Sequence, residues 1–179
     1  IGQASADELT IIDIDGMDAL TSITVVADGE VIISDIDNST DDALEILDLS
    51  GITAGGATVS AITGYADAGL TITGTGFNDT IVNANNDGGE VSVDLGAGND
   101  AYTSVDATET ITTGTGSDTI TFQGDGADDA NVITDFTAGN GGDIIDVDTS
   151  AVVDGTGITA ATSFALIAAD TTASTGLVV

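Results

Sequence analysis

Hydrophobic and polar residues alternate along a series of short segments in the first two thirds of the chain. Examples are LTSITVV at 20–26, LTITGTG at 70–76 and ETITTGTG at 109–116. This period of two is typical of a strand with one buried face, and Gly, Asp or Asn separates most of the segments. Only 40–47 and 157–170 have a helical pattern. The chain is therefore predicted to be all-β.

The segments recur at spacings that predict how they stack. Leu20, Leu44 and Leu70 begin similar runs at spacings of 24 and 26 residues, and Val91 and Glu109 begin the next two at spacings of 21 and 18. Each interval holds two strand segments and two turns, so stacked units form a parallel β-solenoid flattened into a two-sheet roll. The spacings predict coils that shorten along the chain. The absence of Pro fits strands whose N–H groups all pair.

Charge adds a constraint, because the chain has 31 acidic residues and no Lys, Arg or His. The hydrophobic content of 41% is too high for a disordered acidic tail, so a cation from solution must offset the charge. Nucleic acid and anionic membranes are excluded as partners, since nothing here neutralises phosphate. No apolar run reaches the roughly 18 residues of a membrane span, so no membrane insertion is expected. A halophilic surface is an alternative source of acidity, but its acids would scatter, whereas these gather in Gly-rich turns.

A Gly-x-Gly-x-Asp frame appears in several nine-residue windows. The window at 73–81 has one extra residue, so either Asn78 or Asp79 fills the acidic place. A degenerate window at 104–112 keeps an acid, Glu109, but has no Gly. The four windows that fit the frame are 73–81, 95–103, 113–121 and 123–131.

These windows have the chemistry of a calcium site. Gly permits a turn with φ > 0 that directs carbonyl groups inward, and the following Asp adds a carboxylate. Calcium takes six to eight hard oxygens in irregular geometry, which two stacked turns supply and one does not. The simpler alternative is that Gly and Asp are here only as ordinary turn residues.

The 18-residue spacing of Asp100 and Asp118 equals one full coil, so the two residues are predicted to stack on one edge. The turn at 74–79 is expected on that edge one coil earlier, with 83–90 as a loop opposite. The turns near 106–109 and 124–128 are then expected on the other edge. The apolar residues two places after each Asp, Tyr102 and Ile120, are predicted to point into the core.

The windows resemble the nonapeptide Gly-Gly-x-Gly-x-Asp-x-hydrophobic-x of the RTX (repeats-in-toxin) family, a calcium-binding β-roll motif. The first Gly is replaced by Thr73, Leu95, Thr113 or Gln123, whose backbone carbonyls remain candidates. The segment VITDFTAGNGGDIIDVD (132–148) is similar to the stretch that often follows RTX rolls.

The resemblance implies an RTX-type β-roll that binds Ca²⁺. The candidate metal-binding residues are Thr73, Gly74, Gly76, Asn78, Asp79, Leu95, Gly96, Gly98, Asp100, Glu109, Thr113, Gly114, Gly116, Asp118, Gln123, Gly124, Gly126, Asp128, Asp135 and Asp143.

Three parts are expected along the chain, which reads as a piece of a longer protein. Residues 1–72 form solenoid coils without Gly-rich turns, 73–149 form the RTX-like roll, and 150–179 form a cap or the start of a further segment. The acids at 13–18 and 34–42 lack the EF-hand spacing. They are interpreted as a solvated strand face or turn, with additional calcium sites as the alternative.

No catalytic activity is expected. Without His, Cys, Lys or Arg the chain has no Ser–His pair, thiolate, Schiff base or phosphate clamp. Two carboxylates can hydrolyse a glycosidic bond, but no aromatic-lined cleft is evident in the sequence.

The upstream segment 43–81 resembles the solenoid that leads into RTX turns in bacterial surface-layer (S-layer) proteins. This resemblance implies an extracellular structural protein on the bacterial cell surface, exported by a type I pathway, that folds on binding calcium and self-associates into a lattice or filament. One alternative is an RTX adhesin or an ice-binding solenoid, with a ladder of Thr residues from 70–75, 110–115 and 118–122. Another is the calcium-binding roll of a secreted RTX enzyme.

Overall fold

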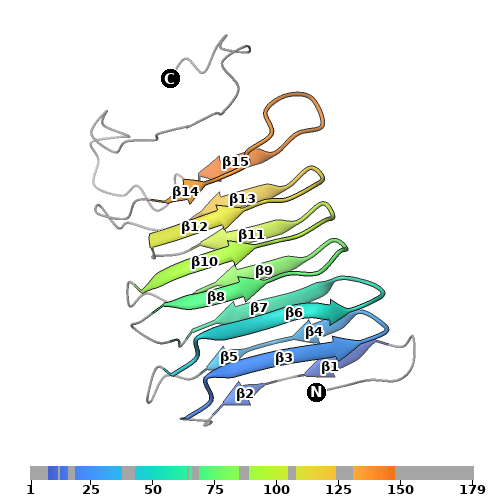
Figure 1. Ribbon diagram of the computed structural model, residues 1–179, viewed down its shortest axis with the longest axis vertical. Coiled ribbons are helices and arrows are strands. Elements are labelled where there is room, and N and C mark those ends of the chain that lie inside the picture. Colours follow the sequence, from blue (N-terminus) through green and yellow to red (C-terminus); the bar gives the residue numbers. More distant parts are fainter. Residues whose placement is uncertain are drawn as a thin grey trace.

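The fold is a parallel β-solenoid of about five turns, without a helix in the described part of the chain. It was obtained as a computed structural model, and the coils stack along its long axis (Figure 1). The predicted all-β fold is thus confirmed. The structure describes residues 8–11, 13–15, 19–37, 43–63, 65, 69–84, 89–104, 108–123 and 131–147.

Two parallel sheets face each other, and the chain passes from one to the other in every coil. The six-stranded sheet contains β3 (Ser22–Ala27), β6 (Ile46–Ile52), β8 (Leu70–Thr73), β10 (Glu90–Asp94), β12 (Thr108–Thr112) and β14 (Val132–Ile133). The nine-stranded sheet contains β1 (Leu9–Ile11), β2 (Ile14–Asp15), β4 (Val31–Ile33), β5 (Ile36–Asp37), β7 (Ala57–Ile62), β9 (Thr80–Asn83), β11 (Ala101–Ser104), β13 (Thr119–Phe122) and β15 (Ile144–Val147).

From β6 onward each coil has one strand in each sheet, which confirms the prediction of two short strands per coil. In the first two coils the strand of the nine-stranded sheet is divided into two shorter ones. The helical pattern at 40–47 is wrong for its described part, because Ile46 and Leu47 begin β6. The segment 157–170 lies outside the described residues.

Strand pairing measures the length of each coil. Between β9 and β15, equivalent positions of the nine-stranded sheet are separated first by 21, then by 18 and finally by 25 residues. The coil therefore shortens to 18 residues and then lengthens again. The predicted shortening holds only as far as Glu109, because the connection after β14 is longer than the turns before it.

Alternation along the strands builds the core between the two sheets. One inward column of the nine-stranded sheet consists of Ile33, Val59, Ile81, Tyr102 and Ile120, and all five side chains have no exposed surface. The prediction that Tyr102 and Ile120 point into the core is confirmed. Within the described ranges, no helix is long and apolar enough to cross a membrane.

The two faces of β6 provide a direct test of this arrangement. Leu47 is fully buried, whereas its neighbour Ile46 is 43% exposed on the outer face. We expect Leu47→Ala to lower the free energy of unfolding by about 2–5 kcal/mol, because it removes apolar contacts and leaves a cavity. Ile46→Ala is the matched control and should change it by less than about 1 kcal/mol. Urea denaturation measures both, and equal losses would contradict the facing of β6.

Candidate metal centre

Several connections from the six-stranded to the nine-stranded sheet lie on one side of the solenoid, at the right of Figure 1. We call this side the turn edge; its residues are 74–79, 95–100, 113–118 and 134–143. The predicted sharing of one edge by the first three turns is confirmed by the pairing of β9, β11 and β13. Thr73 ends β8 beside this edge, and Leu95 follows β10.

One inward Asp stands in each of four consecutive coils at the turn edge. We call Asp79, Asp100, Asp118 and Asp143 the aspartate ladder; each is at most 8% exposed. The backbone N–H of each donates to Oδ1 of the next, at 2.7, 2.8 and 3.1 Å. The N–H of Ala57 donates to Oδ1 of Asp79 at 2.7 Å. The predicted stacking of Asp100 on Asp118 is thus confirmed, and Asp79 rather than Asn78 fills the inward position.

The column that holds the aspartate ladder is apolar in the earlier coils. Leu9 pairs with Val31, and Val31 pairs with Ala57, whose N–H is the first to bond an Asp of the next coil. Val31 and Ala57 are buried. The same inward position therefore changes from hydrophobic to acidic between the coils of β7 and β9.

A second ladder faces outward, one residue before each Asp. The N–H of Asn99 donates to Oδ1 of Asn78 at 2.8 Å, and the N–H of Ser117 donates to Oδ1 of Asn99 at 2.9 Å. The hydroxyl of Ser117 donates to the carbonyl of Gly142 at 2.8 Å. The only sign of these contacts in the sequence is a small polar residue directly before Asp79, Asp100 and Asp118.

The glycines of the second and third turns allow close stacking of the coils. Gly96, Gly98, Gly114 and Gly116 have φ of 93°, 147°, 87° and 143°. A Cβ on Gly116 would lie 1.5 Å from the carbonyl oxygen of Gly98, and one on Gly114 would lie 1.8 Å from that of Gly96. Only Gly fits here, and backbone carbonyls of one coil lie directly against the next.

The first turn is built differently. Gly74 and Gly76 are not among the described glycines with positive φ. A Cβ on Gly76 would meet nothing within 4 Å, while one on Gly74 would lie 2.4 Å from the carbonyl oxygen of Leu95. Gly74 is thus required by close approach, whereas Gly76 is not.

The two middle members of the aspartate ladder have an unsatisfied oxygen. Asp100 is 2% exposed and Asp118 has no exposed surface, yet Oδ2 of each is buried and has no hydrogen-bond partner in the described structure. Their Oδ1 atoms accept the N–H groups of the preceding coil. A buried carboxylate oxygen without a donor is costly, so these two oxygens require a proton or a cation.

The two end members are satisfied by the protein itself. Oδ2 of Asp79 accepts the N–H of Thr75 at 2.7 Å, and its Oδ1 accepts the Thr75 hydroxyl at 2.8 Å. Oδ2 of Asp143 accepts the N–H of Thr137 at 2.8 Å and lies 3.2 Å from the Thr113 hydroxyl.

Asp135 also lies at the turn edge, and both of its carboxylate oxygens accept hydrogen bonds. Its Oδ1 accepts the N–H and the hydroxyl of Thr113 at 2.7 and 3.0 Å, and its Oδ2 accepts the N–H of Gly114 at 2.8 Å. Asp135 therefore closes the end of β12 against the following coil.

Burial raises the pKa values of Asp79, Asp100 and Asp118. The pKa of Asp100 rises to about 7 because burial disfavours its charge, and the charges of Asp79 and Asp118 add to this effect. Burial also raises the pKa values of Asp79 and Asp118; hydrogen bonds from Thr75 and Ala57 oppose the rise at Asp79. Because the chain has no basic residue, only a proton or an external cation neutralises this row.

The donor set fits a hard cation if backbone carbonyls supply part of the ligands. No group of three or more Asp, Glu, His or Cys side chains in the described ranges lies close enough to hold a metal ion. A metal here would therefore take backbone carbonyls of the stacked turns together with the carboxylates of Asp100 and Asp118. Calcium accepts such mixed oxygen ligands, so the residues present fit it.

Glu109 lies inside the roll, in β12, with no exposed surface. Its Oε1 accepts hydrogen bonds from Tyr102 Oη at 2.7 Å and Asn83 Nδ2 at 2.9 Å, and its N–H donates to Asn131 Oδ1 at 2.9 Å. Glu109 continues the inward column of Leu70 and Val91, so it belongs to a buried polar cluster. Burial and the charge of Glu109 raise the pKa of Tyr102.

The remaining predicted positions lie on the edge opposite the turn edge or outside the described part. The described ends of the 83–90 segment, at the end of β9 and the start of β10, lie at the opposite edge as predicted. The N–H of Gln123 donates to Ser104, at the end of β11. The predicted turn near 106–109 is described only from 108 on. Gly124, Gly126 and Asp128 lie outside the described residues.

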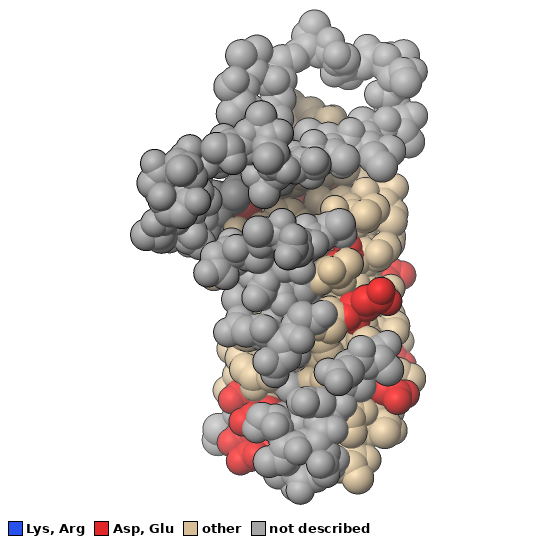
Figure 2. Space-filling model, turned by 90° about the vertical axis from the view of Figure 1, so that its left-hand side faces the viewer, with Lys and Arg blue, Asp and Glu red and all other residues tan. Residues whose placement is uncertain are grey.

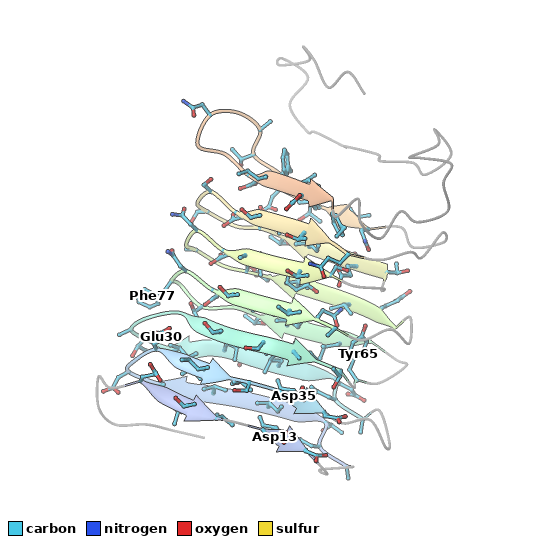
Figure 3. The ribbon with its side chains drawn as sticks, turned by 180° about the vertical axis from the view of Figure 1, so that it is seen from behind. Asp13, Glu30, Asp35, Tyr65 and Phe77 are labelled. Carbon is cyan, nitrogen blue, oxygen red and sulfur yellow. The ribbon has the colours of Figure 1, made fainter. Side chains whose placement is uncertain are left out.

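The N-terminal acids also stack between coils. Asp15 pairs with Asp37, and in the same register Asp13 is level with Asp35; Asp13 and Asp35 lie close together in Figure 3. Asp13 and Asp15 are exposed, as predicted for a solvated strand face, whereas Asp35 is half-buried and its Oδ1 has no hydrogen-bond partner. Burial and the charge of Asp13 raise the pKa of Asp35. Figure 2, which shows the opposite edge, also has acidic side chains over the lower coils.

The Thr-rich segments do not form one continuous ladder. Thr71 and Thr110 both pair with Ser92 in the six-stranded sheet, so Ser92 and Asp94 separate their Thr positions. Thr119 lies in the other sheet, in β13. The Thr residues of the three segments are thus divided between two faces.

Comparison with known proteins adds no relative. No protein-family model, no curated protein and no solved structure matches the chain.

The packing around the glycines predicts that two Gly→Ala substitutions at the turn edge have opposite effects on stability. Gly116→Ala places a Cβ against the Gly98 carbonyl at a positive φ, so we expect it to lower the free energy of unfolding by more than about 2 kcal/mol. Gly76→Ala, with open space around it, should be neutral or stabilising by up to about 1 kcal/mol. Urea denaturation of both variants measures these changes in the free energy of unfolding. A tolerated Gly116→Ala would show that the turns stack less closely.

The raised pKa of Asp100 predicts how stability depends on pH in metal-free protein. A folded-state pKa of about 7, above the ordinary 3.8, means that the folded state holds this proton more tightly. This contribution is fully present below about pH 4 and is lost as the pH rises through about 7. The urea midpoint of metal-free protein should therefore be higher at about pH 5 than at about pH 8. Asp100→Asn should reduce this difference; an unchanged difference would contradict the assignment to Asp100.

Proposed function

We propose that this chain is a calcium-stabilised structural module of an extracellular bacterial surface layer. The observation that carries the proposal is the pair of buried, unpartnered Oδ2 atoms of Asp100 and Asp118, one coil apart at the turn edge. An ion held by both carboxylates would convert their mutual repulsion into a link between coils.

Calcium is favoured over magnesium by the kind of donors present. The turn edge offers carboxylates and backbone carbonyls at positions fixed by the stacked turns, and calcium tolerates irregular geometry with six to eight oxygens. Magnesium demands a near-ideal octahedron and gives up water reluctantly. Calcium is also available outside cells at concentrations that suit weak, multiple sites.

The surface-layer part of the proposal rests on the resemblance of 43–81 to the solenoid that leads into RTX turns in S-layer proteins. The repetitive rod with a charge of −31 is compatible with it, because calcium can join acidic faces of neighbouring copies. A chain of this charge would remain unfolded where calcium is scarce and fold after export, since binding to the native state stabilises it by linkage.

Stability measurements with and without calcium test the proposal. At a free calcium concentration about 100 times the dissociation constant, each site should add about 2.7 kcal/mol to the free energy of unfolding. Asp100→Asn and Asp118→Asn should each reduce this gain, while in chelated protein they should be neutral or stabilising because a buried charge is removed. Asp94→Asn, an exposed acid of the same coil, is the control and should keep the full gain.

Two outcomes of these measurements would contradict the proposal. Equal stabilisation by magnesium and calcium would exclude a calcium-selective site, and an unchanged gain in both Asn variants would place the ion elsewhere. Electron microscopy of the calcium-loaded chain tests the surface-layer part. Ordered sheets or filaments are expected, whereas single particles at saturating calcium would favour a binding module or the roll of a secreted enzyme.

A further inference from the structure

We propose that the turn at 74–79 does not use calcium because Thr75 donates to its Asp79 carboxylate, so that within the aspartate ladder calcium acts only from the turn at 95–100 onward. The coils from β6 to β9 would then form a calcium-independent base on which the later coils assemble. This inference rests on the proposed calcium binding and concerns where along the chain that binding is needed.

The hydrogen bonds of the aspartate ladder carry the first step. The carboxylate of Asp79 has three donors from the protein: the N–H of Ala57 and both the hydroxyl and the N–H of Thr75. Asp100 and Asp118 each accept one backbone N–H and retain a buried oxygen without a partner. The ladder therefore begins with a carboxylate that needs no ion.

The extra residue of the first turn explains the difference. Thr115 occupies the corresponding place in the third turn, through the stacking of Ala97 on both residues, but it is exposed and leaves Oδ2 of Asp118 without a donor. Thr115 lies three residues before its Asp, whereas Thr75 lies four before Asp79.

Phe77 lies within the longer turn and supports this arrangement. Its N–H donates to the Thr75 hydroxyl at 3.0 Å, and the hydroxyl proton has two acceptors, Oδ1 of Asp79 at 2.8 Å and the Phe77 carbonyl at 3.1 Å, of which Asp79 is the nearer. The Phe77 side chain itself is 39% exposed and projects outward from the turn edge (Figure 3). The residue therefore acts through its backbone and its contribution to turn length.

The coils below this turn pack through apolar side chains, although between β3 and β5 Oδ1 of Asp28 and Oδ1 of Asp35 are buried without a hydrogen-bond partner. At the inward column of the turn edge they present Val31 and Ala57 instead of acids, and Leu47 and Ile72 are fully buried in the facing sheet. Burial of such side chains stabilises folding without an ion. The free edges of β8 and β9 then provide the ladder partners for β10 and β11, as stacking of repeats requires.

Hydrogen exchange of the whole chain, read by mass spectrometry in chelator and in excess calcium, tests this inference. Amides of β6 to β9 should exchange equally slowly in both conditions. Amides of β10 to β13 should exchange about tenfold faster or more in chelator. If calcium binds and protection is lost uniformly over all coils, the inference is overturned while the proposed function stands. If calcium changes no protection and does not bind, the proposed function fails.

Deletion of Phe77 provides the matched test of the turn itself. It gives the first turn the spacing of the other two, so Thr75 should lose its contact with Asp79. We expect β8 and β9 to become calcium-dependent in hydrogen exchange and the chain to bind one more calcium ion by isothermal titration calorimetry.

The control for this deletion is Phe77→Ala, which keeps the length and the backbone donor and should leave both readouts unchanged. Thr75→Val removes only the hydroxyl and should weaken protection of β8 and β9 in chelator. Wild-type protection and stoichiometry in both the deletion and Thr75→Val would overturn the role of Thr75.

Discussion

From the coil of β7 to that of β15, each coil is joined to the next by a buried carboxylate that accepts a backbone N–H from the coil before it. The Oδ1 atoms of Asp100 and Asp118 make such bonds at 2.7 and 2.8 Å. This contact fixes the register of the nine-stranded sheet, because a slip of one residue would turn the Asp outward. It also places negative charge in the interior without any basic residue to balance it. The raised pKa values, the closely stacked glycine turns and the requirement for a cation all follow from placing carboxylates in the interior.

The chain therefore combines two ways of closing a coil. Where Val31 and Ala57 stand, the inward column itself is apolar, although Oδ1 of Asp28 and Oδ1 of Asp35 nearby in the chain of the first coils are buried without a hydrogen-bond partner. From Asp79 on, the same position holds a carboxylate. The free-energy cost of burying this carboxylate depends on which hydrogen-bond donors reach it. Thr75 and Thr137 supply donors at the two ends of the ladder, so the unsatisfied oxygens are confined to its middle.

The pattern of the sequence predicted the parts of this structure that depend on local rules. Alternation gave the strands, and the 18-residue repeat of Asp100 and Asp118 gave one coil, because period and turn chemistry are set by neighbouring residues. The donor role of Thr75 and the burial of Glu109 against Tyr102 depend on residues 4 and 7 positions apart that meet only after the turn or coil has formed. Calcium binding at the candidate site stays a prediction from chemistry and resemblance.

The hydrogen bonds of the aspartate ladder all run in one direction, from the N–H of an earlier coil to the carboxylate of a later one. The rod therefore has two chemically different ends. A break on the C-terminal side of a coil leaves an amide without its acceptor, whereas a break on the N-terminal side leaves an acid without its donor. Loss of the Asp118 carboxylate thus leaves the N–H of residue 100 without its acceptor, whereas Asp118 keeps its own donor when the Asp100 carboxylate is lost, because that donor is a backbone N–H.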